Sequence, residues 1–144
     1  MPKFIVSDSA TQLTAFQIDK LAKSDDFENT YFIELDLKTV ISGVSDELVN
    51  RVLSNFGQNN IVVVHTSKLI TSFDGFCDES LNAGLTKSKL GFIITDFLAE
   101  LTKRVVEQRE LILITLGGET SYKCCRAIDS MQLQLVDEVA PSIA

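Results

Sequence analysis

Apolar residues along this chain occur in two patterns, short dense runs and longer stretches with helical spacing. The short runs are rich in Val, Ile and Leu and lie between polar segments. Runs of this kind are typical of strands in a parallel sheet. The strands that they predict are residues 3–7, 30–37, 61–64, 111–116 and 132–139.

The predicted strands differ in how their two faces are composed. In residues 30–37, one face of the predicted strand is apolar, whereas the other face carries Phe32, Glu34 and Asp36. This strand is therefore expected to be half-exposed or at an edge of the sheet. Residues 61–64 are apolar throughout, and residues 111–116 contain only Thr115 as a polar residue. Both of these strands are therefore predicted to be buried on their two faces.

Helical spacing of apolar residues fills the segments between the strands. One predicted helix ends near Lys23, and the others span residues 45–56, 86–108 and 120–130. Ser45 is the expected N-cap of the second helix, with Asp46 in its first turn.

This alternation of strands and helices, without a repeat or a linker, predicts an α/β fold. We expect one three-layer domain over residues 1–144, with a mainly parallel sheet of about five strands flanked by helices. Ligands of such sheets bind beyond the carboxyl ends of the strands. Three polar loops, residues 7–14, 65–67 and 117–121, are expected to converge there.

The third of these loops has the composition of an anion site. Gly117 and Gly118 follow a predicted strand, and Thr120 or Ser121 can cap the helix that comes next. Free N–H groups and the helix dipole favour phosphate at such a turn. A plain tight turn has the same composition, and neither a P-loop nor a dinucleotide fingerprint is present. Glu119 would repel a phosphate unless a metal ion lay between them.

Composition narrows the partners of this domain. The chain has 144 residues, 45% of them hydrophobic, and a net charge of −7. Such a charge argues against nucleic acid and against an acidic membrane surface, but not against a nucleotide held by main-chain N–H groups. Neither a membrane-spanning run nor a signal peptide is recognisable, so a cytoplasmic protein is expected.

The remaining reactive residue types favour structural roles. Cys77, Cys124 and Cys125 form no metal-binding pattern with the single histidine, so we expect reduced thiols and no zinc site. His65 is the single histidine of the chain and is interpreted as structural. An acidic group, Asp74, Asp78 and Glu79, is interpreted as part of a solvated loop.

Two segments carry a resemblance to a known family. Residues 8–17 read Asp-Ser-Ala-Thr-Gln-Leu-Thr-Ala-Phe-Gln, and residues 115–120 read Thr-Leu-Gly-Gly-Glu-Thr. They resemble the Gly-Ser-x-Ser-x-x-Thr-x-x-Gln and Thr-Gly-Gly-Glu/Asp-Thr motifs of one domain, the C-terminal nucleotide-binding domain of the four-carbon acid sugar kinase family. Some members of that family are labelled Hrp-dependent type III effector relatives. Asp8 replaces the motif's glycine, and Leu116 is inserted in the second motif.

The resemblance implies an ATP- or ADP-binding domain that works with Mg²⁺. The nucleotide contacts that it implies are Ser9, Thr11, Gly117, Gly118, Glu119 and Thr120. Kinases of this family carry a larger N-terminal domain that binds the sugar acid and supplies the catalytic base, and this chain has no such part. Phosphoryl transfer is therefore expected only with a substrate-binding domain on a separate or missing chain.

Other interpretations of the same residues stay open. One is a non-catalytic ligand-binding or regulatory module with the same fold, which Asp8 favours because its charge would lie close to the phosphates. Another is an unrelated doubly wound domain. Each of them is compatible with a homo-oligomer.

Overall fold

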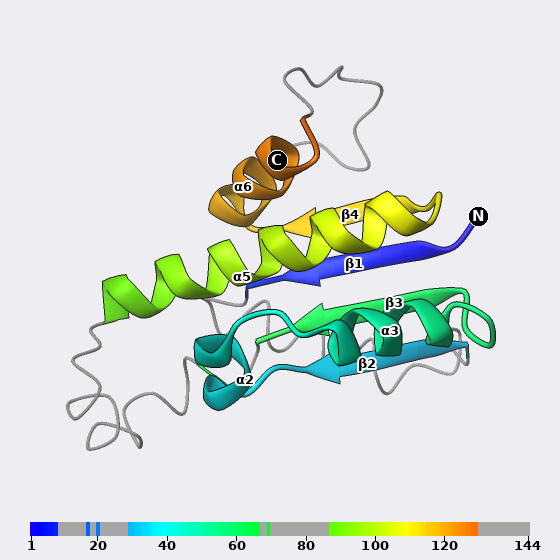
Figure 1. The fold of residues 1–144 in the computed structure, drawn as a ribbon, viewed down its shortest axis with the longest axis horizontal. Coiled ribbons are helices and arrows are strands. Elements are labelled where there is room, and N and C mark those ends of the chain that lie inside the picture. Colours follow the sequence, from blue (N-terminus) through cyan, green and yellow to red (C-terminus); the bar gives the residue numbers. More distant parts are fainter. Residues whose placement is uncertain (9–16, 18–19, 21–28, 67–68, 70–86, 130–144) are drawn as a thin grey trace.

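The computed structural model describes residues 1–8, 17, 20, 29–66, 69 and 87–129. The elements that follow one another along these residues are β1 (Lys3–Ser7), β2 (Thr30–Glu34), α2 (Leu37–Ser42), α3 (Asp46–Asn55), β3 (Ile61–His65), α5 (Lys87–Gln108), β4 (Ile112–Leu116) and α6 (Gly118–Ala127). Figure 1 shows them as one sheet with helices packed against it. This is the α/β fold that the sequence predicts.

The described sheet has four strands in the order β2-β3-β1-β4, and every neighbouring pair is parallel. Phe4 of β1 pairs with Val62 of β3 on one side and with Leu113 of β4 on the other. The strand number is thus four where about five were expected. The additional predicted strand, residues 132–139, lies outside the described residues. Of the predicted helix that ends near Lys23, only residues 17 and 20 are described, and both are helical.

The core forms between this sheet and two helices, α3 and α5, which lie in front of it in Figure 1. The Phe4 ring of β1 meets the Phe56 ring just after α3 edge-to-face, with centroids 6.2 Å apart. On α5, the side chains of Leu98, Leu101 and Val105 are fully buried. Burial on this scale is the main stabilising contribution in a domain of this size.

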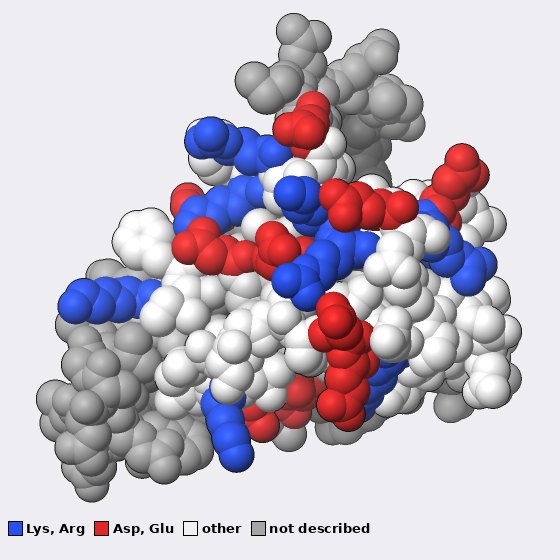
Figure 2. Space-filling view, viewed as in Figure 1, with Lys and Arg blue, Asp and Glu red and all other residues white. Residues whose placement is uncertain are grey.

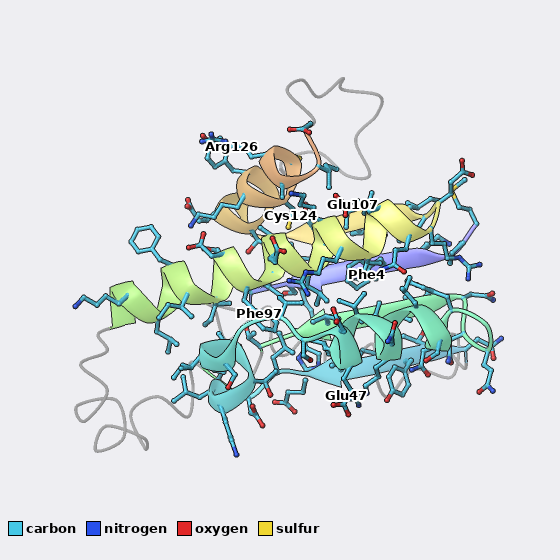
Figure 3. The ribbon with its side chains drawn as sticks, in the orientation of Figure 1. Phe4, Glu47, Phe97, Glu107, Cys124 and Arg126 are labelled. Carbon is cyan, nitrogen blue, oxygen red and sulfur yellow. The ribbon has the colours of Figure 1, made fainter. Side chains whose placement is uncertain are left out.

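Helix α6 packs along α5 rather than standing alone. The thiol of Cys124 lies 3.5 Å from Thr102 Oγ1 of α5, and both residues are fully buried. Figure 3 shows Cys124 where the two helices meet. This contact joins the second half of α6 to α5.

The prediction of a strand over residues 30–37 is wrong at its carboxyl end. Strand β2 ends at Glu34, and α2 begins at Leu37. Asp36 causes the change, because its Oδ1 accepts a hydrogen bond from the Thr39 N–H at 2.7 Å and so caps the new helix. The prediction that this strand lies at an edge is confirmed, because β2 is the first strand of the described sheet.

The prediction that residues 111–116 form a strand is confirmed, but the prediction that this strand is buried on both faces is wrong. The strand exists as β4, but it lies at the other edge of the described sheet and Ile112 is 44% exposed. Residues 61–64 do form a buried strand, because β3 lies between β2 and β1, and Val62, Val63 and Val64 are all 0% exposed.

Candidate functional site

The carboxyl ends of the three strands β3, β1 and β4 lie side by side. Ser7 ends β1 and pairs with His65 of β3 and with Leu116 of β4. For the parts of the predicted polar loops that the structure describes, convergence at one edge of the sheet is therefore confirmed. In the sheet order β2-β3-β1-β4, the connection that follows β1 leads to β2 at one edge of the sheet, and the connection that follows β3 leads to β4 at the other edge. A reversal of this kind marks the usual ligand-binding edge of an open α/β sheet.

The turn between β4 and α6 depends on Gly117. Its φ of 103° and ψ of 134° lie in a region that side chains rarely allow. The carbonyl of Gly117 accepts hydrogen bonds from the Ser121 N–H at 2.9 Å and from Ser121 Oγ at 2.7 Å. Ser121 Oγ also lies 2.7 Å from Thr115 Oγ1 on β4. Together these contacts hold the turn in one conformation.

The prediction that Thr120 or Ser121 caps this helix is wrong. Gly117 is the N-cap, α6 begins at Gly118, and among the described residues no side-chain cap hydrogen bond is formed. The main-chain N–H groups of a first helical turn have no partner within the helix. The start of α6 therefore presents uncapped donors and the positive end of a ten-residue helix to the edge of the sheet.

Asp8 lies directly against this turn. A Cβ atom placed on Gly117 would lie 2.5 Å from Asp8 Oδ1 and 3.7 Å from Thr120 Oγ1. Burial raises the pKa of the Asp8 carboxyl, and the nearby Glu119 carboxylate raises it further, while the Thr120 hydroxyl acts in the opposite sense. The carboxylate thus occupies space at the start of α6 in which an anion would be expected.

Three buried hydroxyls at this edge have no hydrogen-bond partner. The side-chain oxygens of Ser7, Thr66 and Thr120 are buried and unpaired, and each of these residues is 0% exposed. Thr120 lies close enough to Asp8 to influence its pKa, yet it makes no hydrogen bond within ordinary distance and angle limits. The remaining unpaired buried hydroxyl of the described chain, that of Thr30, lies at the amino end of β2. Unpaired buried hydroxyls are uncommon in proteins, and their grouping makes this edge of the sheet the candidate site.

The structure places the predicted site residues unevenly. Gly118 and Glu119 are exposed at the start of α6, beside the buried Thr120. Ser9 and Thr11 lie outside the described residues. Sequence reasoning included Ser7 and Thr66 only as members of polar loops. The signal that singles them out is a hydroxyl residue placed directly at the end of an apolar strand.

The other reactive residues have structural surroundings. His65 is 6% exposed and its ring meets Phe32 edge-to-face, with centroids 6.2 Å apart, which supports its structural interpretation. Burial raises the pKa of the Cys124 thiol, so this group stays protonated and unreactive, as a reduced core thiol should. Cys77 and the acidic group of residues 74, 78 and 79 lie outside the described part of the chain.

Away from this edge of the sheet, a hollow lies on the surface where α5 and α6 meet. It has a volume of about 370 Å³, and its lining residues are Asp96, Ala99, Glu100, Tyr122, Lys123, Arg126 and Ala127. Its charged groups are engaged with neighbours, Lys123 Nζ with Asp96 Oδ1 at 2.7 Å and Arg126 with the Tyr122 hydroxyl at 3.2 Å. Figure 2 shows acidic and basic side chains interspersed on this face. Two acidic and two basic residues line the hollow, so it offers no net positive charge to a phosphate.

None of the helices in the described ranges is long and apolar enough to cross a membrane.

Comparison with known proteins identifies the domain. Residues 4–144 match the family model described as "nucleotide-binding C-terminal domain". The match extends over nearly the whole chain, so the chain belongs to this family of nucleotide-binding domains. No curated protein matches the sequence.

A solved structure supports the fold. The chain is similar to the crystal structure of Haemophilus influenzae protein HI1011, which carries the family label DUF1537, with a TM-score of 0.71 and 17% sequence identity. The similarity covers 90% of this chain and 29% of that protein, so this chain spans less than a third of its neighbour's length. DUF1537 is the four-carbon acid sugar kinase family, and the resemblance carried by the two motifs is confirmed.

Proposed function

We propose that this chain binds ATP or ADP, with Mg²⁺, at the carboxyl edge of its sheet, and that it is the nucleotide-binding part of a sugar-acid kinase-like protein. The phosphates are held by Gly117, Gly118 and Thr120 at the start of α6. Ser9 and Thr11, which follow β1, supply further contacts by resemblance to the family motif. The observation that carries the proposal is the uncapped start of α6 beside the buried, unpaired hydroxyl of Thr120.

The chemistry of the described edge fits this role. Main-chain N–H groups and hydroxyls bind phosphate oxygens without a basic patch, which agrees with the net charge of −7. The exposed carboxylate of Glu119 is suited to contact with Mg²⁺ or a ribose hydroxyl rather than with phosphate itself. Phosphoryl transfer also needs a positioned acceptor and a base, which we assign to a substrate-binding domain on a separate or missing chain.

A second candidate function is a non-catalytic ligand-binding or regulatory module. The specific observation in its favour is the Asp8 carboxylate, which lies against the turn that would hold the phosphates. In such a module the fold would be retained while nucleotide binding is weak or lost.

Calorimetric titration of the purified chain with Mg-ATP and Mg-ADP tests the proposal, alongside Gly118→Val. No atom lies within 4 Å of a Cβ placed on Gly118, so this substitution fits the fold while its side chain enters the phosphate site. Gly91→Val is the matched control, because a Cβ at this α5 position also meets open space. We expect saturable binding in the wild type and the control, and none in Gly118→Val.

Two results would contradict the proposal. One is absence of binding in wild-type protein that circular dichroism shows to be folded, which would favour the non-catalytic module. The other is equal binding in all three proteins, which would place the nucleotide away from the turn.

A further inference from the structure

We propose that Asp8, together with Glu119 and the Thr120 hydroxyl, binds a divalent cation of the Mg²⁺ type, and that this cation makes nucleotide binding by this chain metal-dependent. The second half of the inference rests on the function proposed above, whereas the cation site itself does not. Two elements supply the ligands, the end of β1 and the first turn of α6.

The geometry brings two oxygen atoms to one place. The position that a Cβ on Gly117 would take lies 2.5 Å from Asp8 Oδ1 and 3.7 Å from Thr120 Oγ1. Thr120 is 0% exposed, and its hydroxyl lies near Asp8 but has no hydrogen-bond partner within ordinary distance and angle limits, so this buried oxygen is available to a ligand. Carboxylate and hydroxyl oxygens are donors that suit Mg²⁺ and Mn²⁺.

The charges at this point also lack compensation. Asp8 and Glu119 are both carboxylates, and within the described residues neither forms an ion pair with a basic side chain. A phosphate bound at the start of α6 would add further negative charge. A divalent cation between these groups turns the repulsion into attraction.

The protein supplies only part of a coordination shell. Within the described ranges, no three side chains of His, Cys, Asp or Glu gather as a ready-made metal site. Mg²⁺ is usually bound by one or two carboxylates, with waters and substrate phosphates filling its octahedron. A site of this kind binds the cation weakly alone and more tightly with a nucleotide, so each ligand should increase the affinity for the other.

The cation site can be tested without nucleotide, using Mn²⁺ alone as a paramagnetic probe of the full chain. We expect substoichiometric Mn²⁺ to broaden the amide NMR signals of Asp8 and of residues 117–120 in the wild type, and to leave them sharp in Asp8→Asn. The control is Asp46→Asn, which removes the same charge from an exposed residue at the start of α3. Broadening that persists in Asp8→Asn, or that never affects these residues, would overturn the cation site.

The coupling to nucleotide is tested by titrating ADP in Mg²⁺ and in EDTA. Removing the metal should weaken ADP binding about tenfold or more in the wild type, within the usual range of coupling between two ligands. In Asp8→Asn, the affinities in Mg²⁺ and in EDTA should converge, because the metal ligand and the repelling charge are both gone. If Asp8→Asn instead strengthens ADP binding equally in both conditions, Asp8 is only a repelling charge and the inference is wrong.

The two experiments separate the two proposals. Broadening by Mn²⁺ without any ADP binding would support the cation site and refute the proposed nucleotide function. ADP binding that is insensitive to EDTA, with no broadening at Asp8, would support the nucleotide function and refute the cation site.

Discussion

Buried hydroxyl groups occur in two regions of this molecule, and only one region satisfies them. In α5, Thr95 Oγ1 lies 3.1 Å from the Gly91 carbonyl, and Thr102 Oγ1 lies 2.7 Å from the Leu98 carbonyl. At the carboxyl edge of the sheet, Ser7, Thr66 and Thr120 are buried as deeply but have no partner.

The difference lies in where the missing partner must come from. A threonine inside a helix can donate to a carbonyl one turn earlier, so its hydroxyl is satisfied by its own element. A hydroxyl at the end of a parallel strand, or in the first turn of a helix as in Thr120, has no helical carbonyl one turn earlier, and its burial is unfavourable until another group forms a hydrogen bond with it. The buried hydroxyls of α5 are therefore satisfied within the fold, while we propose that those at the edge of the sheet are satisfied by a ligand.

The largest expected effect comes from Gly117→Ala, which disrupts the edge and leaves the core untouched. A Cβ there would lie 2.5 Å from Asp8 Oδ1, and the φ of 103° is strained for alanine. We expect the free energy of unfolding to fall by about 1–3 kcal/mol, the usual cost of such a backbone conformation. Denaturant unfolding measures this loss. The control is Gly118→Ala, where the added Cβ meets open space, and an equal loss in both variants would contradict the assigned role of Gly117.

Smaller effects on the free energy of unfolding, of opposite sign in the two regions, are expected from Thr102→Val and Thr120→Val. Thr102 loses a hydrogen bond, so unfolding should become easier by about 1 kcal/mol. Thr120 loses only an unpaired hydroxyl, so without ligand its variant should be as stable as the wild type or more stable. Thermal and denaturant unfolding of the ligand-free chain compare the two. Destabilisation of similar size in both variants would show that the Thr120 hydroxyl is already satisfied in the ligand-free protein.

The smallest expected effect concerns how stability depends on pH: the contributions of Asp36 and Asp8 to the free energy of unfolding change in opposite directions as pH rises. The Thr39 hydroxyl and N–H lower the pKa of Asp36, so its stabilisation is present above the unfolded-state pKa and is lost as pH falls through the folded-state value. Burial raises the pKa of Asp8, so its stabilisation is present below the unfolded-state pKa and is lost as pH rises through the folded-state value.

Two charge-removing variants, studied in EDTA, measure this difference. At neutral pH, Asp36→Asn should unfold slightly more easily than the wild type, and Asp8→Asn slightly less easily. Carboxyl carbon NMR titration should place the Asp36 midpoint below, and the Asp8 midpoint above, the ordinary aspartate pKa. Asp8 titrating below that value would show that the carboxylate is already stabilised by the protein.

Local patterns predicted the elements well where each element is fixed by its own residues. Ser45 caps α3 as expected, with its Oγ accepting a hydrogen bond from the Leu48 N–H at 3.2 Å. The meeting of the polar loops also followed from the strand ends, because parallel strands present the same end to the same edge. Helix α2 was missed because the alternation in residues 30–37 continues past the point where Asp36 begins a helix.

Strands β3 and β4 show what composition could not decide. Both are runs of branched apolar residues, yet β3 is enclosed between two strands and β4 lies at the edge of the described sheet. The order of strands depends on contacts between distant segments, which periodicity does not record. Asp8 and Gly117, more than a hundred residues apart, lie in loops that were expected to converge, but no local pattern indicated that Asp8 Oδ1 would lie directly against Gly117.

The position of β1 has a consequence for how the protein folds. Its two neighbours, β3 and β4, both follow it in the chain, and Phe4 pairs with Val62 and with Leu113. During synthesis, β1 therefore leaves the ribosome long before either neighbour exists. Its apolar residues stay unpaired until β3 and β4 have been made. Pairings between such distant residues are slow to form. The strand that ends beside the candidate site is thus made before the other described strands and is enclosed only after β3 and β4 have formed.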